Sequence, residues 1–223
     1  MVQNLKLGKL SDSITLTSED SNVSSAGFIL DNKRTTSDSP VMPNETVVID
    51  GVSVTNVYDH SAYICTDAYG CYYNSYTATA GSMTSSTTAG TTVDYSICPK
   101  GWTLPTSGSG SGEFGVLAVA YGYDPEETDE SQKASVASAM LVAEPSTTTE
   151  NINGQYVPGF LLGGGYAARS SNIGVNGSYW SRTAYSAERG YRLRFDSSNV
   201  YPYNTYYKYI AQPVRCLLQE TNS

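Results

Sequence analysis

The chain has 223 residues, a length that suits one domain with a sizeable buried core, and we expect a single domain over residues 1–223. Its formal net charge of −8 argues against a general nucleic-acid binder, because that role needs a basic surface. No apolar run approaches the roughly 20 residues of a membrane-spanning helix, so no membrane insertion is expected.

The first 92 residues predict short strands separated by polar loops. Residues 4–16 alternate enough to give short strands, whereas residues 18–43 are polar and predict a loop. The segment "TVVIDGVSV" (46–54) is rich in β-branched residues around a central Asp-Gly, which is typical of a β-hairpin. Residues 73–92 are small and polar, and predict a long surface loop.

Two helices are predicted in the middle of the chain. "EFGVLAVAYGY" (113–123) has apolar residues at helical spacing, with Gly122 as its stop. "DESQKASVASAMLVAEP" (129–145) has an acidic first turn and ends at Pro145. The apolar positions of the two helices are Phe114, Leu117, Ala118 and Tyr121, and then Val136, Ala139 and Met140.

From residue 156 onward the sequence predicts strands and turns only. In "YRLRFD" (191–196), alternate residues fall on opposite faces of a strand. Tyr191, Leu193 and Phe195 form the face that we expect to be buried. Arg192, Arg194 and Asp196 form the face that we expect to meet solvent or a ligand. Short strands at both ends with helices between them indicate an α+β fold.

Residues 178–216 differ in composition from the rest of the chain. They hold six basic and two acidic residues, a local charge of +4, against −12 elsewhere, and eight of the nineteen tyrosines. No period of 2 or 3.6 places the tyrosines of "NVYPYNTYYKYI" (199–210) on one buried face. Binding surfaces favour Tyr and Arg, because Tyr gives a large contact area with few rotatable bonds. The segment therefore predicts a binding surface; the alternative is an edge strand that packs on a neighbouring protomer.

Catalytic and metal-binding motifs are weak. "GSGEFG" has the glycine spacing of a dinucleotide-binding loop, but no buried strand precedes it. The single histidine, His60, has no nucleophile elbow near it, and the cysteine spacings fit no zinc pattern. We therefore expect no catalytic residue, metal or cofactor. The four cysteines are expected to form disulfides, with reduced buried thiols as the alternative.

Several motifs resemble a known family when they are taken together. In order, they are "MVQNLKLGKL", "GCYYNSYTATAG", "ICPKGWTLPT", "GEFGVL", "GSYWSRTAYS" and "PVRCL". This set spans nearly the whole chain and resembles the major paralogous domain of Fibrobacter and its relatives, a formylglycine-generating-enzyme-like branch of the C-type-lectin fold. The resemblance implies that a strand near residues 4–7 pairs with one near residues 214–218. Because "YWSR" replaces the Trp-Asn-Asp strand of calcium-dependent lectins, calcium-dependent sugar binding is not implied.

Within that family, residues 178–216 resemble the variable region of a diversity-generating retroelement protein, most nearly those of archaea or archaeal viruses. Such systems mutate template adenines, which turns Asn codons into codons for Tyr, Ser, Asp, Arg or Ile. The implied variable, ligand-binding residues are Arg182, Tyr185, Arg189, Arg192, Arg194, Asp196, Tyr201, Tyr203, Asn204, Tyr206, Tyr207 and Ile210. Trp180, Glu188, Lys208 and Gln212 cannot arise in this way and are implied to be scaffold.

The resemblance implies a non-enzymatic binding or display protein whose partner is a protein or cell-surface ligand. We expect a monomer at an extracellular or virion surface, although the first ten residues show no signal peptide. In an oxidising compartment, we expect Cys65 to pair with Cys71 and Cys98 to pair with Cys216. A formylglycine-generating-type oxidase and a structural surface-layer or virion subunit remain alternative functions.

Overall fold

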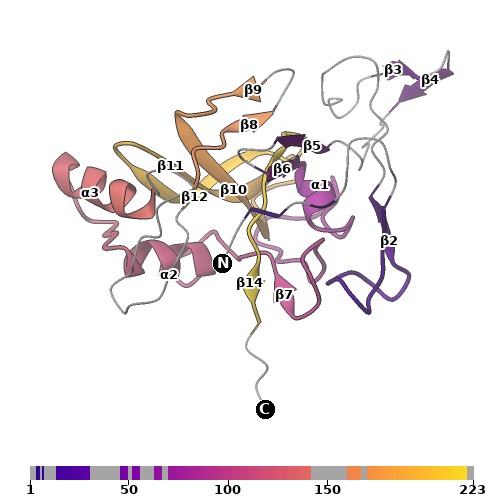
Figure 1. The fold of residues 1–223 in the computed structure, drawn as a ribbon, viewed down its shortest axis with the longest axis horizontal. Helices are drawn as coiled ribbons and strands as arrows, with labels where there is room; N and C mark the ends of the chain where they lie inside the picture. The colour runs from indigo at the N-terminus through magenta and orange to yellow at the C-terminus, as the bar shows by residue number, and fades with distance from the viewer. Residues whose placement is uncertain are drawn as a thin grey trace.

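The computed structural model is an α+β structure with few helices and short antiparallel strands, as predicted (Figure 1). It describes residues 4, 5, 7, 14–30, 46–49, 52–55, 63–66, 70–141, 160–166 and 170–219. For residues 46–49, 52–55, 63–66, 70, 166, 170 and 171, only the backbone is described. Among the described residues, none of the helices has both the length and the hydrophobicity of a membrane-spanning segment.

A three-stranded antiparallel sheet carries most of residues 178–216. Its strands, in order, are β10 (Asn176–Ala184), β11 (Arg189–Asp196) and β12 (Val200–Tyr207). On one face of β11, Leu193 and Phe195 are completely buried, as the alternation predicted. Tyr191, the third residue of that face, is half-buried.

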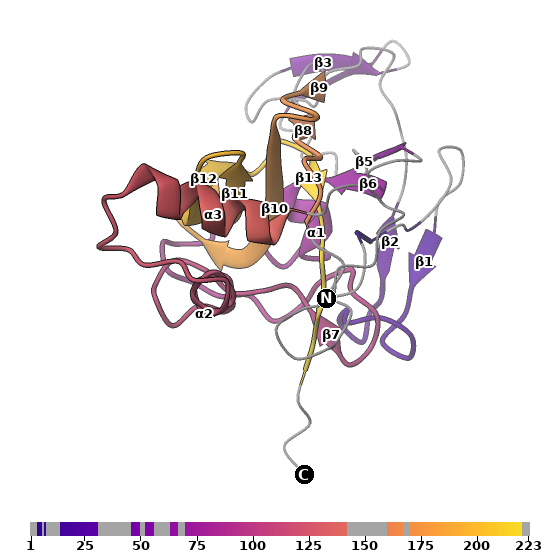
Figure 2. The same cartoon turned by 60° about the vertical axis from the view of Figure 1, so that its left-hand side comes forward.

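Two helices pack against this face of the sheet. They are α2 (Glu113–Ala120) and α3 (Glu130–Met140), and Figure 2 shows both beside β10–β12. Phe114 of α2 and Met140 of α3 join Leu193 and Phe195 in one buried cluster. These contacts anchor the sheet and leave its other face for further packing or for a ligand.

The helix boundaries largely follow the predictions. α2 is followed by Gly122, which has a φ of +94°, a conformation that glycine adopts without strain. The Asp129 side chain accepts a hydrogen bond from the Ser131 N–H and caps α3. However, α3 ends at Met140 rather than near Pro145, and Ala137 is buried in place of the predicted Ala139.

A third helix, α1 (Ser75–Ala78), lies in the segment predicted to be a surface loop. That prediction is wrong for residues 73–79, which are all buried. Asn74 Oδ1 accepts from the Thr77 N–H at 2.8 Å, and the Thr79 hydroxyl donates to the Ser75 carbonyl at 2.8 Å. Small polar residues can be buried here because they satisfy one another's hydrogen bonds locally.

A second core cluster forms around Trp180, which is completely buried at the other face of β10. The Trp180 Nε1–H donates to the Tyr73 carbonyl at 3.0 Å. Tyr73 ends β6 (Gly70–Tyr73), which pairs with β5 (Tyr63–Thr66) and β13 (Gln212–Pro213). The last short strand, β14 (Leu217–Leu218), pairs with β7 (Trp102–Thr103).

Residues near the two ends of the described chain are in contact, but they do not form the strand pairing that the resemblance implied. The Leu5 N–H donates to the Val214 carbonyl at 2.8 Å, and Arg215 Nε donates to Asn4 Oδ1 at 2.8 Å. Residues 4, 5 and 7 are not themselves in a strand, so the pairing is a local contact rather than a ladder.

One of the two expected cysteine pairs is confirmed. Cys98 and Cys216 form a disulfide across a sequence separation of 118 residues, which confirms that pair. Cys71 is also disulfide-bonded, and Cys65 lies directly opposite it in the register of β5 and β6.

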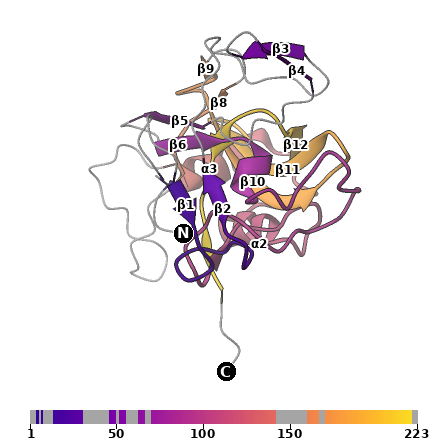
Figure 3. The ribbon, with the colours of Figure 1, turned by 90° about the vertical axis from the view of Figure 1, so that its right-hand side faces the viewer.

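Three two-stranded hairpins lie around this body, as Figure 3 shows. They are β1 (Ile14–Leu16) with β2 (Phe28–Leu30), β3 (Thr46–Ile49) with β4 (Val52–Thr55), and β8 (Gly165–Tyr166) with β9 (Ser170–Ser171). Ile49 lies opposite Val52, which confirms the predicted hairpin at residues 46–54. β2 lies inside residues 18–43, so the prediction of a continuous loop there is wrong at 28–30.

Candidate ligand-binding surface

Three arginines of β11 stack on three tyrosines of β12. The guanidinium carbon lies 4.4 Å from the ring centre for Arg189 on Tyr207, 4.1 Å for Arg192 on Tyr206, and 5.0 Å for Arg194 on Tyr201. We call these six residues the Arg–Tyr ladder. Such pairs contribute about 0.5–1 kcal/mol each at exposed sites and about 2 kcal/mol or more when they are desolvated, so they help to hold the side chains in place.

The strand register explains how these pairs form. Arg189 lies opposite Tyr207, and Arg194 lies opposite Tyr201. Cross-strand neighbours have Cβ atoms about 5 Å apart, which is within reach of long side chains. Arg192 lies opposite Asn204 instead, and its guanidinium reaches diagonally to the Tyr206 ring.

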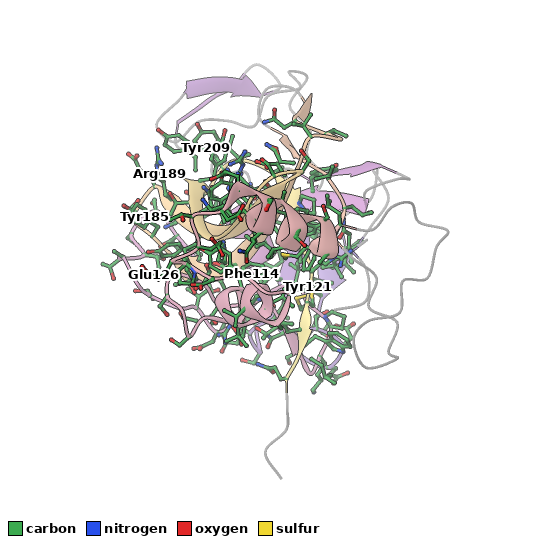
Figure 4. All side chains as sticks on the ribbon, turned by 90° about the vertical axis from the view of Figure 1, so that its left-hand side faces the viewer. Phe114, Tyr121, Glu126, Tyr185, Arg189 and Tyr209 are labelled. Carbon is green, nitrogen blue, oxygen red and sulfur yellow. A yellow bond between two sulfur atoms is a disulfide. The ribbon has the colours of Figure 1, made fainter. Side chains whose placement is uncertain are left out.

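Several residues of the predicted binding set are accessible. Tyr185 is 46% exposed, Tyr201 is 38% and Tyr206 is 36%. Arg189, Arg194 and Tyr207 are half-buried because they stack on their neighbours. Figure 4 shows Tyr185, Arg189 and Tyr209 along one outer edge of the molecule.

Tyr209 extends the ladder, although the predicted set omitted it. Its ring stacks on Tyr207 with centres 5.4 Å apart, and Tyr206 meets Tyr207 edge to face at 6.1 Å. The tyrosine-rich composition of residues 199–210 could have indicated Tyr209. The resemblance did not include it among the variable positions.

Two residues of the predicted ligand-binding set, Arg192 and Ile210, are buried, and the expectation that Arg192 faces outward is wrong. Ile210 is 5% exposed and packs beside Gly165. Arg192 is 9% exposed because the Tyr206 ring covers it. Arg192 Nε donates to Asn204 Oδ1 at 2.8 Å, and burial lowers the pKa of Arg192 to about 10.

Other residues of the predicted set make contacts within the fold. Arg182 Nε donates to the Leu104 carbonyl and its Nη1 donates to the Val93 carbonyl, both at 3.0 Å. The half-buried Tyr203 packs on α2, where a Cβ at Gly115 would lie 2.6 Å from the Tyr203 hydroxyl. Asp196 forms an ion pair with Arg194 at 3.2 Å and accepts from the Ser198 hydroxyl at 2.7 Å.

The implied scaffold residues are mostly buried. Trp180, Lys208 and Gln212 have no exposed surface, whereas Glu188 is exposed. Lys208 Nζ donates to the carbonyls of Thr84 and Ala187, both at 2.9 Å.

A cavity of about 160 Å³ lies between β10 and the ladder. Its lining consists of Gly164, Gly165, Asn172, Asn176, Ser178, Arg192, Arg194, Tyr206 and Ile210. We call it the arginine cavity. Asn176 and Ser178 were not predicted as site residues. Their alternation in "NGSYW" places them on one face of a strand, but the sequence alone does not show that this strand pairs with β11.

A second cavity, of about 390 Å³, borders the start of α2. Its lining is Gly90, Thr92, Thr106, Ser107, Gly108, Ser109, Ser111, Gly112, Thr183 and Tyr191. None of its lining residues belongs to the Arg–Tyr ladder, so this cavity is separate from the candidate binding surface.

Few ion pairs form within the part of the chain that the structure describes. The ion pairs found there are Lys133 with Glu130 and Arg194 with Asp196. Within the same ranges, no group of three His, Cys, Asp or Glu side chains could hold a metal ion.

Comparisons of this chain with protein-family models, with curated protein sequences and with solved structures find no match.

Proposed function

We propose that this chain is a non-enzymatic ligand-binding protein with a C-type-lectin fold of the formylglycine-generating-enzyme-like form. Residues 178–216 would carry its diversified recognition surface, and the partner would be a variable protein or a cell-surface ligand. The observation that carries this proposal is the Arg–Tyr ladder, in which large side chains capable of recognition lie on strands held by a separate buried core.

The chemistry of the ladder suits recognition. Tyr and Arg dominate the energy of many protein interfaces, because they combine a broad contact area with hydrogen-bonding groups. Stacking restricts each arginine before a ligand arrives, which lowers the entropy lost on binding. The exposed parts of Tyr201 and Tyr206 remain available to a partner.

We propose a narrower set of residues that contact a macromolecular ligand. Positions that combine accessibility with few contacts to the fold are Tyr185, Arg189, Arg194, Tyr201, Tyr206 and Tyr207. Arg182 and Ile210 serve the fold instead, since one bonds to main-chain carbonyls and the other is buried. Randomising the narrower set should therefore leave the scaffold intact.

The meeting of Leu5 with Val214 supports the proposed fold, since the resemblance implies paired ends. The Cys98–Cys216 disulfide supports a structural role for both cysteines. An oxidase of the formylglycine-generating type remains testable, because copper- and oxygen-dependent conversion of a cysteine peptide by the purified protein would overturn the non-enzymatic proposal.

Two displayed libraries of the full chain test the recognition function. The first randomises Tyr185, Tyr201, Tyr206 and Tyr207, and a matched control library randomises Leu193 and Phe195. Both are scored for protease resistance and for binding to a fixed panel of purified proteins and glycan-coated beads. We expect most members of the first library to fold and to differ in binding, whereas most members of the control library unfold.

Two outcomes would overturn the proposal. If most of the first library unfolds, the tyrosines serve the core or a subunit interface. If its members fold but none gains or loses a binding partner, the ladder is not a recognition surface. Light scattering of the parent protein tests the alternative of a structural subunit. A monomer at all concentrations would exclude that alternative, because it would exclude an interface between copies.

A further inference from the structure

Arg192 is a buried cation whose hydrogen-bond partners are neutral. Its Nε donates to Asn204 Oδ1 at 2.8 Å, and its Nη1 donates to the Ser178 hydroxyl at 3.3 Å. No carboxylate among the described residues forms an ion pair with it. Removing a cation from water without a counterion is costly, and burial accordingly lowers the pKa of Arg192 to about 10.

A second arginine lines the same cavity. Arg194 borders the arginine cavity beside Arg192, and its positive charge further disfavours ionisation of Arg192. Arg194 pairs with Asp196 through Nη2 alone, at 3.2 Å. Two guanidinium groups therefore border one small hollow in a protein whose net charge is −8.

The wall of the cavity also holds an unpaired amide atom. Asn176 is 8% exposed, and its Oδ1 has no hydrogen-bond partner within the ranges that the structure describes. A buried amide atom without a partner costs free energy. Turning the amide exchanges its oxygen and nitrogen positions, which would place an NH₂ donor where the unpaired oxygen now lies.

The geometry points to an oxyanion subsite in the arginine cavity, which takes a carboxylate, sulfate or phosphate group of the ligand. Guanidinium groups match the paired oxygens of such anions, and the anion would neutralise the buried charge. The volume of about 160 Å³ fits a group of a few heavy atoms, since one water molecule occupies about 30 Å³ in the liquid. This inference rests on the proposed function, in which the ladder contacts the rest of the ligand.

Titration of the full chain with small anions tests the subsite. The arginine Nε–Hε resonances are followed by NMR as sodium acetate or inorganic phosphate is added, with sodium chloride at equal ionic strength as reference. We expect the signals of Arg192 and Arg194 to move and to saturate with at least one of the two anions. The signal of Arg182 should stay in place, because main-chain carbonyls already hold its guanidinium.

The choice of anion identifies the group that the site prefers. Stronger binding of acetate would assign the subsite to a carboxylate, and stronger binding of phosphate would assign it to a tetrahedral anion. Either result supports the inference. Shifts that chloride reproduces, or shifts that never saturate, would overturn it.

Two arginine variants form a matched pair. Arg194→Gln should weaken the fitted dissociation constant about tenfold or more, because it removes a charged donor from the cavity. Arg189→Gln should change it less than about twofold, since Arg189 stacks on Tyr207 in the same way but does not line the cavity. Equal effects of the two variants would mean that the anions respond only to overall charge.

Asn176→Asp tests the subsite while both arginines of the cavity stay in place. It places a carboxylate of nearly the same shape in the cavity wall, so we expect it to abolish anion binding. Anion binding that survives in this variant would overturn the subsite.

The outcomes also separate this inference from the proposed function. Saturable anion binding without any partner in the library experiment would support the subsite and count against the recognition surface. Library-selected partners whose binding ignores Arg194→Gln and Asn176→Asp would support the surface and overturn the subsite.

Discussion

Gly177 of β10 lies directly opposite Phe195 of β11, and the Phe195 ring occupies the space where a side chain at position 177 would begin. The ring is completely buried and meets Phe160 edge to face with centres 5.7 Å apart. A glycine at this position therefore lets the sheet, α2 and α3 close around one aromatic cluster.

Gly177→Ala should destabilise the protein by about 1–3 kcal/mol, because the added methyl overpacks the core against Phe195. The control is Gly110→Ala, where a Cβ would meet nothing closer than the Tyr203 hydroxyl at 3.8 Å. We expect that control to change the free energy of unfolding by less than about 0.5 kcal/mol in urea denaturation. If Gly177→Ala is as stable as the wild type, the register of β10 on β11 is wrong.

The ladder and the core beneath it should respond differently to truncation. Leu193→Ala should cost roughly 2–5 kcal/mol, because Leu193 is completely buried. Tyr201→Ala should cost less than about 1 kcal/mol, since it removes one exposed cation–π pair with Arg194. Urea denaturation of both variants checks the difference. A Tyr201→Ala cost equal to that of Leu193→Ala would make the ladder part of the core.

For residues 191–196, the sequence predicts which side chains share a face of the strand but not which of them are covered by other side chains. A period of 2 separates Leu193 and Phe195 from Arg192 and Arg194 without any knowledge of the fold. The expectation that Arg192 faces outward is nevertheless wrong, because the Tyr206 ring partly covers the face of β11 on which Arg192 lies. Which side chain covers another depends on strand register, and the register is a long-range property.

Other parts of the site also depend on contacts between residues that are far apart in the sequence. Asn176 and Ser178 join Arg192 in one cavity only because β10 pairs with β11 in this register. Ile210 is buried because it packs beside Gly165, 45 positions earlier in the chain. The buried segment 73–79 was missed for another reason: polar composition usually means exposure, but here hydrogen bonds between neighbours satisfy the polar groups.

The observed Cys98–Cys216 disulfide and the expected Cys65–Cys71 pair should contribute unequally to stability. In the chain-entropy account, removing Cys98–Cys216 with a double serine substitution should cost about 4–5 kcal/mol, because the pair spans 118 residues. The control is Cys65→Ser with Cys71→Ser, which opens a much shorter loop and should cost roughly 2–3 kcal/mol. Urea denaturation without reductant gives both values. The reverse order would contradict this account, and four free thiols in the denatured wild-type protein would rule out both pairs.

Lys208 should make stability depend on pH at alkaline values. It has no exposed surface, and its ammonium group donates to the carbonyls of Thr84 and Ala187. Burial lowers its pKa from an ordinary value of 10.5 to about 8. Between these two values the unfolded chain binds more protons at Lys208 than the folded protein does. The contribution of Lys208 to the free energy of unfolding is therefore lowest below pH 8 and rises as the pH increases toward 10.5.

The measurement is urea denaturation of the wild type and Lys208→Met from pH 7 to pH 10.5. Tyrosines also ionise near the upper end, but they are present in both proteins and cancel in the difference. We expect the stability of the wild type relative to Lys208→Met to rise across this range by an amount on the order of 3 kcal/mol. A difference that stays flat would mean that Lys208 titrates at its ordinary pKa in the folded protein. A difference that falls would mean that the fold favours the charged ammonium, with its two carbonyl hydrogen bonds outweighing its burial.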